Sequence, residues 1–218
     1  VKANREEGLK GAFFDGRFKS QYLADDDAII ACMTYIDLNP VRAKKAKSIE
    51  DSIFTSGYAR MLAQTAQMNV DAIEATTYKD EDALTYYQKN EISLENKIIQ
   101  EAAFLAPFAT KESNIKNDFN LATVSSSKSF LPITVEKYLK LLDQTGREYH
   151  KNKPGVIEDK FAPILEAMGF QHENWMLKIK HYGSWYYRAI GPLAKLTDKL
   201  TSTKQRWFKG IKLWENPK

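Results

Sequence analysis

One stretch constrains the fold more than any other: an amphipathic run that begins at Asp25 and ends at Asn39-Pro40. Three consecutive aspartates open the run, and carboxylates in the first turn of a helix complement the helix dipole. Apolar residues then recur at helical spacing from Ala28 to Ile36, which predicts a helix with one buried face. Because a residue before proline is pushed out of helical geometry, we expect this helix to end near Asn39.

Tyr35 and Asn39 lie four residues apart near the end of this predicted helix. Side chains four apart lie one above the other on the same face, so a phenol and an amide carbonyl would point toward one small volume. That arrangement suits a tyrosine nucleophile if a phosphate and a metal ion sit there. A tyrosine on an apolar helix is also a common core residue, and the spacing alone leaves both interpretations open.

Aromatic and basic residues alternate just before the helix, in the segment from Phe13 to Leu23. A period of two predicts a strand, with Arg17, Lys19 and Gln21 on one of its faces. All three side chains can donate hydrogen bonds to phosphate oxygens. A basic strand face that only keeps the protein soluble is the alternative interpretation.

The residue pattern of the rest of the chain predicts helices. Together with the strand predicted within 13–23, this gives an expected fold class of α+β that is mostly helical. A second helix is expected over about 53–67, and the polar residues 114–128 have the composition of a linker. We therefore divide the chain into 1–68, an acidic helical and linker region at 69–128, and an all-helical module at 129–218.

Charge is distributed unevenly along the chain. Residues 48–127 carry six Lys and Arg against twelve Asp and Glu, whereas residues 128–218 carry seventeen against nine. A basic C-terminal third suggests a polyanion partner, although a lysine-rich solvated helical surface explains the charge equally well. The aromatic and basic residues of 181–188 are open to the same pair of interpretations, base stacking or core packing.

Several classes of protein are disfavoured. The single cysteine, Cys32, permits no intrachain disulfide and favours a reducing compartment. No apolar stretch approaches the roughly 20 residues of a membrane span, so we expect no membrane partner. The three histidines, of which His150 is the first, do not have the spacing of a zinc site, and no phosphate-binding glycine loop is present.

Two sets of motifs resemble one family. The first set is GRFKSQ at 16–21, the acidic helix start, and ACMTYIDLNPVRA at 31–43. The second set comprises LPI at 131–133, YLKLLD at 138–143, TGR at 145–147, ENW at 173–175, HYG at 181–183 and RWF at 206–208. Together they resemble the single-tyrosine HUH transposases, in the branch associated with repetitive extragenic palindromes, with the second set matching the C-terminal extension of larger members.

The resemblance implies cleavage and rejoining of single-stranded or hairpin DNA without a nucleotide cofactor. Tyr35 would be the nucleophile that forms a 5′-phosphotyrosine link, and Asn39 would contribute an oxygen to a bound Mg²⁺ or Mn²⁺. Arg17, Lys19, Gln21 and Arg42 would contact DNA. The resemblance also implies a bacterial cytoplasmic protein that associates with the nucleoid, and a strand and tyrosine-bearing helix that are remnants of a ferredoxin-like domain.

The sequence departs from the family in one respect. The family's two metal-binding histidines lie upstream of GRFKSQ, and this chain has no histidine before His150. With the first residue being Val1, we expect a C-terminal portion of a transposase that binds the metal poorly and does not cleave DNA by itself. Two alternatives stay open: a non-catalytic nucleic-acid-binding helical module, and a helical interaction domain with no nucleic acid partner.

Overall fold

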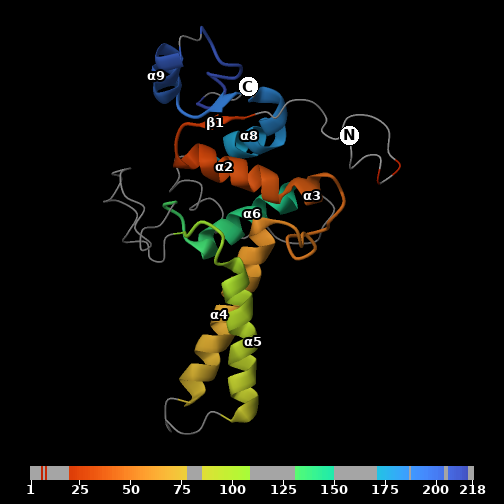
Figure 1. The fold of residues 1–218 in the computed structure, drawn as a ribbon. Helices are drawn as coiled ribbons and strands as arrows, with labels where there is room; N and C mark the ends of the chain where they lie inside the picture. The colour runs from red at the N-terminus through yellow and green to blue at the C-terminus, as the bar shows by residue number, and fades with distance from the viewer. Residues whose placement is uncertain are drawn as a thin grey trace. The chain divides into compact units, whose positions relative to one another are not determined.

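The structure is a computed structural model, and it describes residues 6, 8, 20–77, 85–108, 131–149, 171–186, 188–203 and 206–215. Among these residues the chain forms, in order, β1 (Tyr22–Leu23), α2 (Asp26–Asp37), α3 (Asn39–Arg42), α4 (Ser56–Thr77), α5 (Tyr86–Ala102), α6 (Val135–Tyr149), α8 (His172–Trp185), β2 (Ala189–Ile190) and α9 (Leu193–Thr203) (Figure 1). The predicted α+β class with mostly helical content is confirmed, and the ferredoxin-like origin of the strand stays a prediction.

The chain forms two compact units that interleave in sequence. The larger unit contains residues 26–182, and the smaller unit joins the residues before 26 to those from 183 onward. Among the described residues, no helix has the length and apolar composition needed to cross a membrane.

Helices α2, α4, α6 and the first part of α8 supply the core of the larger unit. Its largest fully buried side chains include Trp175, Tyr138, Leu141, Leu142, Ile179, Leu38 and Ile30. Helices α4 and α5 lie side by side as a helical hairpin (Figure 1). None of the α5 residues is buried.

The helical path does not stop at the proline. Leu38 keeps right-handed helical geometry, with φ of −86° and ψ of 0°, and its N–H donates to the carbonyl of Thr34 at 3.0 Å. Pro40 lies in the first turn of α3, where its missing N–H costs nothing. The predicted helix end near Asn39 is confirmed to within two residues, because α2 ends at Asp37, and a separate short helix, α3, then continues to Arg42.

Helix α4 is longer than predicted. The residue pattern predicts a helix end near residue 67, whereas α4 continues to Thr77, so the predicted domain boundary at 68/69 falls inside one continuous helix. Helix α5 begins at a capping box in which the Thr85 hydroxyl accepts from the Gln88 N–H and the Gln88 side chain accepts from the Thr85 N–H. The division into three domains stays a prediction.

The smaller unit contains a two-stranded parallel sheet. Tyr22 pairs with Ala189 and Leu23 pairs with Ile190, and the Tyr22 N–H donates to the carbonyl of Arg188 at 2.7 Å. Leu196 of α9 and Phe208 pack with Ala189 in a small buried cluster. The predicted strand is confirmed at its last two residues, and its residues 13–19 lie outside the described part of the chain. The prediction of an all-helical C-terminal region is wrong at β2.

Candidate functional site

Tyr35 lies on the last full turn of α2, half-buried, within the larger unit. The ring of Tyr182 stacks on it, with ring centroids 4.7 Å apart and an interplanar angle of 25°. The central guanidinium carbon of Arg42 lies 4.2 Å from the centroid of the Tyr35 ring. A cation at this distance is attracted by the ring quadrupole, so Arg42 and Tyr182 together hold the Tyr35 side chain in place.

The local fold explains why Arg42 reaches Tyr35. The two residues are seven positions apart, and seven residues of continuous helix return a side chain to the same face. This return requires that helical geometry resume after Pro40, which α3 provides. Arg42 Nη2 also donates a long hydrogen bond, 3.5 Å, to the carbonyl oxygen of Lys180 on α8.

The observed environment of Tyr35 agrees in part with each of its two interpretations, as a core residue and as a nucleophile. Its ring packs against aromatic and cationic neighbours, as the core interpretation predicts, but the residue is not fully buried. For residues 181–188 the core interpretation is favoured, because Tyr182 and Tyr186 are 4% and 3% exposed. Base stacking on these two rings would require them to be open to solvent.

The other predicted site residues are placed differently. Asn39 is exposed at the start of α3, and Arg42 is half-buried beside Tyr35. Gln21 is half-buried in the smaller unit, next to β1. Arg17 and Lys19 lie outside the described residues. Of the predicted site, the structure therefore brings together Tyr35 and Arg42.

The described residues near Tyr35 do not fit the implied metal ion. Mg²⁺ and Mn²⁺ favour several oxygen ligands, of which carboxylates are the strongest. The charged group over Tyr35 is the guanidinium of Arg42. The nearby carboxylate of Asp37 is buried and already accepts hydrogen bonds from Ser56 and Tyr138. Within the described ranges no three His, Cys, Asp or Glu side chains gather into a metal-binding group. Asn39 is thus a single predicted ligand rather than a site.

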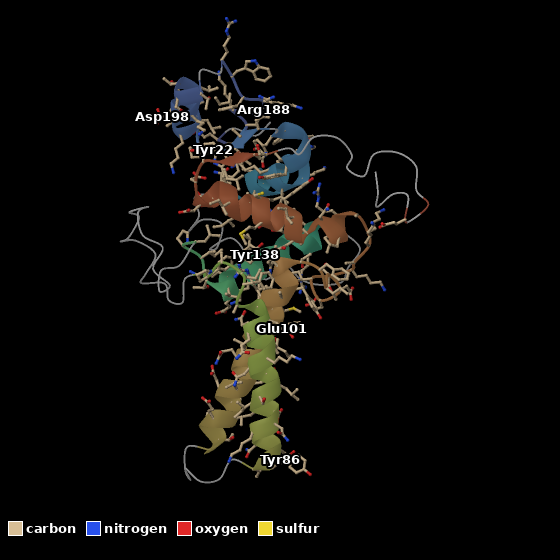
Figure 2. All side chains as sticks on the ribbon, viewed as in Figure 1. Tyr22, Tyr86, Glu101, Tyr138, Arg188 and Asp198 are labelled. Carbon is tan, nitrogen blue, oxygen red and sulfur yellow. The ribbon has the colours of Figure 1, made fainter. Side chains whose placement is uncertain are left out.

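Asp37, two residues after Tyr35, is a further residue of the site that was not predicted from the sequence. Its carboxylate is buried, with the residue only 3% exposed. It accepts hydrogen bonds from the Ser56 N–H at 3.1 Å, from the Ser56 hydroxyl at 2.9 Å, and from the Tyr138 hydroxyl at 2.6 Å. Asp37 therefore joins the helix that carries Tyr35 to the start of α4 and to α6, where Figure 2 labels Tyr138.

Arg60 completes the buried polar group around Asp37. Its Nη2 donates to the carbonyl oxygen of Ala106 at 2.9 Å, and its guanidinium carbon lies 3.8 Å from the centroid of the Phe108 ring. Burial lowers the pKa of Arg60 below its ordinary value, an effect opposed by the nearby Tyr138 and Asp37. Burial also raises the pKa of Tyr138 well above its usual range, and the adjacent Asp37 carboxylate raises it further.

Gly57 permits the close approach of these elements. A Cβ at position 57 would lie 2.7 Å from Cδ1 of Leu142 and 3.2 Å from Oδ2 of Asp37. A sequence signal for Asp37 existed, because it lies at helical spacing with the buried residues Ile30 and Thr34. A charged residue at an apolar position of a helix predicts a buried partner, but the sequence does not say that the partner is Tyr138.

No family model, no curated protein and no solved structure matches this chain.

Proposed function

We propose that this chain is the tyrosine-bearing portion of a single-tyrosine transposase that acts on single-stranded or hairpin DNA, with Tyr35 as its nucleophile. The observation that carries the proposal is the pairing of Tyr35 with Arg42 inside the YIDLNPVR motif, at 4.2 Å. A phosphate approaching the Tyr35 hydroxyl would meet a guanidinium nearby. Guanidinium groups bind phosphates through paired hydrogen bonds and stabilise the negative charge that develops during attack.

The proposed reaction conserves the phosphodiester energy. The Tyr35 oxygen attacks the phosphorus and loses its proton, the bond from phosphorus to the 3′ oxygen breaks, and that oxygen leaves as a 3′-hydroxyl after taking up a proton. The product is a 5′-phosphotyrosine link, which another 3′-hydroxyl can attack to rejoin DNA. No nucleotide is consumed in either direction.

In this proposal the 218 residues bind DNA, and metal-assisted cleavage belongs to the intact enzyme. The family's pair of metal-binding histidines is not among these 218 residues, whose first histidine is His150. A divalent cation, Mg²⁺ or Mn²⁺, would polarise the phosphate in the intact enzyme. No step is assigned to a metal held by the described residues, among which no three His, Cys, Asp or Glu side chains gather. These 218 residues by themselves are proposed to bind DNA.

Covalent trapping tests the assignment of Tyr35. The chain, together with whatever its reading frame encodes upstream of Val1, is incubated with a labelled DNA hairpin and Mn²⁺, then separated under denaturing conditions. We expect an adduct with the parent and with a Tyr86→Phe control, whose ring is 75% exposed on α5. Tyr35→Phe should give no adduct while it still binds the hairpin. An adduct that persists in Tyr35→Phe contradicts the assignment.

A non-catalytic nucleic-acid-binding module is the second candidate, favoured by the absence of the histidine pair from this sequence. It predicts hairpin binding and no adduct even when the upstream reading frame is included. Titrating binding against salt separates both candidates from a helical interaction domain, because phosphate contacts require affinity to fall as salt rises.

A further inference from the structure

Folding gathers positive charge in the smaller unit. Its residues, those before 26 and those from 183 onward, include thirteen Lys and Arg against six Asp and Glu, a net charge of +7. The larger unit carries nineteen Lys and Arg against twenty-two Asp and Glu, a net charge of −3. Because a phosphate backbone is attracted to a basic surface, the smaller unit is the part of the chain whose net charge suits a nucleic acid.

Trp207 combines an exposed aromatic ring with neighbouring cations in this unit. Its side chain is 69% exposed, whereas Trp214, seven residues later, is 4% exposed. A single exposed apolar ring is common on protein surfaces and has no meaning by itself. Here Arg206 precedes the ring and Lys209 and Lys212 follow it, and all three are exposed. Within the described part of the chain, none of these three cations forms an ion pair with a carboxylate.

Buried contacts fix the segment that presents Trp207. Phe208 and Trp214 are buried on either side of the three lysine and glycine positions between them, and Phe208 packs against residues of β2 and α9. The Tyr186 hydroxyl donates to the carbonyl oxygen of Leu213 at 3.2 Å. Glu215 accepts a hydrogen bond at 2.9 Å from the N–H of the first residue of α9. A ring held on a fixed segment loses little conformational freedom when it binds a ligand.

We propose that residues 206–212 form a contact site for single-stranded DNA, an inference that rests on the proposed function. The indole of Trp207 stacks on one unpaired base, and Arg206, Lys209 and Lys212 contact the phosphates of the same strand. Stacking on an aromatic side chain is available to every base, so this site binds with little sequence preference. Tyr35 and Arg42 belong to the larger unit, so the two sites can be tested separately.

The strand must be unpaired at this site, because the bases of a duplex already stack on one another. An anionic membrane is the other surface that attracts cations and an indole. Segments that bind membranes present several apolar side chains on one face. The other aromatic residues of this segment, Phe208 and Trp214, are buried, which favours a nucleic acid strand.

Substitution of Trp207 tests the stacking contact. The affinity of the chain for a labelled oligothymidylate is measured by fluorescence anisotropy. Trp207→Ala should weaken binding by about 5- to 150-fold, the range for one stacked base, and Trp207→Phe should give an intermediate affinity. Phe104→Ala, which removes an 80% exposed ring from the larger unit, should bind like the parent. Because Trp207 is exposed, its substitution should leave the circular dichroism spectrum and the midpoint of thermal unfolding unchanged.

Salt titration separates the stacking contact from the charged contacts. Trp207→Ala should leave the slope of log affinity against log salt unchanged, because it removes no charge. Lys209→Ala should make that slope shallower by about 0.7, the value for one phosphate contact on a single strand. An oligonucleotide of abasic residues keeps the phosphates and lacks the bases, so the parent and Trp207→Ala should bind it equally.

Parental affinity of Trp207→Ala for oligothymidylate overturns this site and leaves the proposed function standing. An equal loss of affinity for the abasic strand or for a blunt duplex overturns the stacking contact. Binding of the parent to phosphatidylserine vesicles but not to any oligonucleotide overturns both proposals. Loss of oligothymidylate binding in Trp207→Ala, with no Tyr35 adduct in the parent, supports this site while the assignment of Tyr35 fails.

Discussion

Tyr138 donates its phenolic hydrogen to Oδ2 of Asp37 across 2.6 Å, joining two residues that are 101 positions apart in sequence. Both side chains are buried, with exposures of 0% and 3%. Asp37 belongs to the same helix as Tyr35, and Tyr138 belongs to α6. The contact therefore fixes the tyrosine-bearing helix to an element of the C-terminal half, independently of whether the chain cleaves DNA.

Removing the Tyr138 hydroxyl should destabilise the fold. Tyr138→Phe leaves the ring packing against Phe108 intact, with which it makes an edge-to-face contact at 5.2 Å, but withdraws one donor from a buried carboxylate. We expect a loss of about 1–3 kcal/mol in the free energy of unfolding, measured by urea denaturation. Tyr86→Phe, on an exposed ring, should change it by less than about 0.5 kcal/mol. Equal effects of the two substitutions would contradict the role of the Asp37 contact.

The raised pKa of Tyr138 predicts how the stability of the fold depends on pH. Burial and Asp37 raise the pKa of Tyr138 in the native state, whereas in the unfolded chain the phenol titrates near its ordinary value of about 10. Above that pH the unfolded state releases a proton that the native state retains, so stability falls as pH rises. The expected contribution of Tyr138 is a fall of about 1.4 kcal/mol per pH unit.

Urea unfolding of the parent chain and of Tyr138→Phe between pH 9 and pH 11 measures this contribution. The parent should lose stability more steeply than the variant once the pH passes about 10. Parallel pH profiles would show that the native pKa of Tyr138 is not raised.

Gly57 and Gly146 offer a paired test of close packing around the same helices. Alanine is the better helix former by about 1 kcal/mol, so both substitutions have an intrinsic gain. At position 57 the new Cβ would lie 2.7 Å from Leu142, and at position 146 it would lie 3.3 Å from Leu38. We expect Gly57→Ala to destabilise by about 1–3 kcal/mol and Gly146→Ala to stay within about 1 kcal/mol of the parent. Thermal unfolding ranks them, and the reverse order would contradict the observed approach of α4 to α6.

Local signals in the sequence were sufficient for several elements. The acidic start of α2 is confirmed. Thr134 is a typical cap residue, and its hydroxyl accepts a hydrogen bond from the Lys137 N–H at 3.2 Å at the start of α6. The capping box at Thr85 has the local sequence signature T-x-x-Q, which the predicted elements did not include. Strand β2 has only two residues, too few for a period-two pattern to appear.

The site was predictable only in part, because its decisive contacts depend on tertiary structure. Tyr35 and Arg42 were singled out separately, as nucleophile and as phosphate contact. Their closeness requires that the chain resume helical geometry after Pro40, whereas the sequence favours an end there. Asp37 and Tyr138 carry no local signal of their pairing, since 101 residues separate them.

Arg42 provides the most direct test of whether the Tyr35 site meets DNA. If its guanidinium contacts one phosphate, Arg42→Ala should weaken hairpin binding, and the slope of log affinity against log salt should become shallower by about 0.7, the value for one contact on a single strand. Arg42→Lys keeps the charge and should retain the slope, although it loses the paired geometry. Lys97→Ala, an exposed cation on α5, serves as the matched control and should leave both affinity and slope unchanged. An unchanged slope in Arg42→Ala would remove Arg42 from the DNA interface, and with it the phosphate contact proposed beside Tyr35.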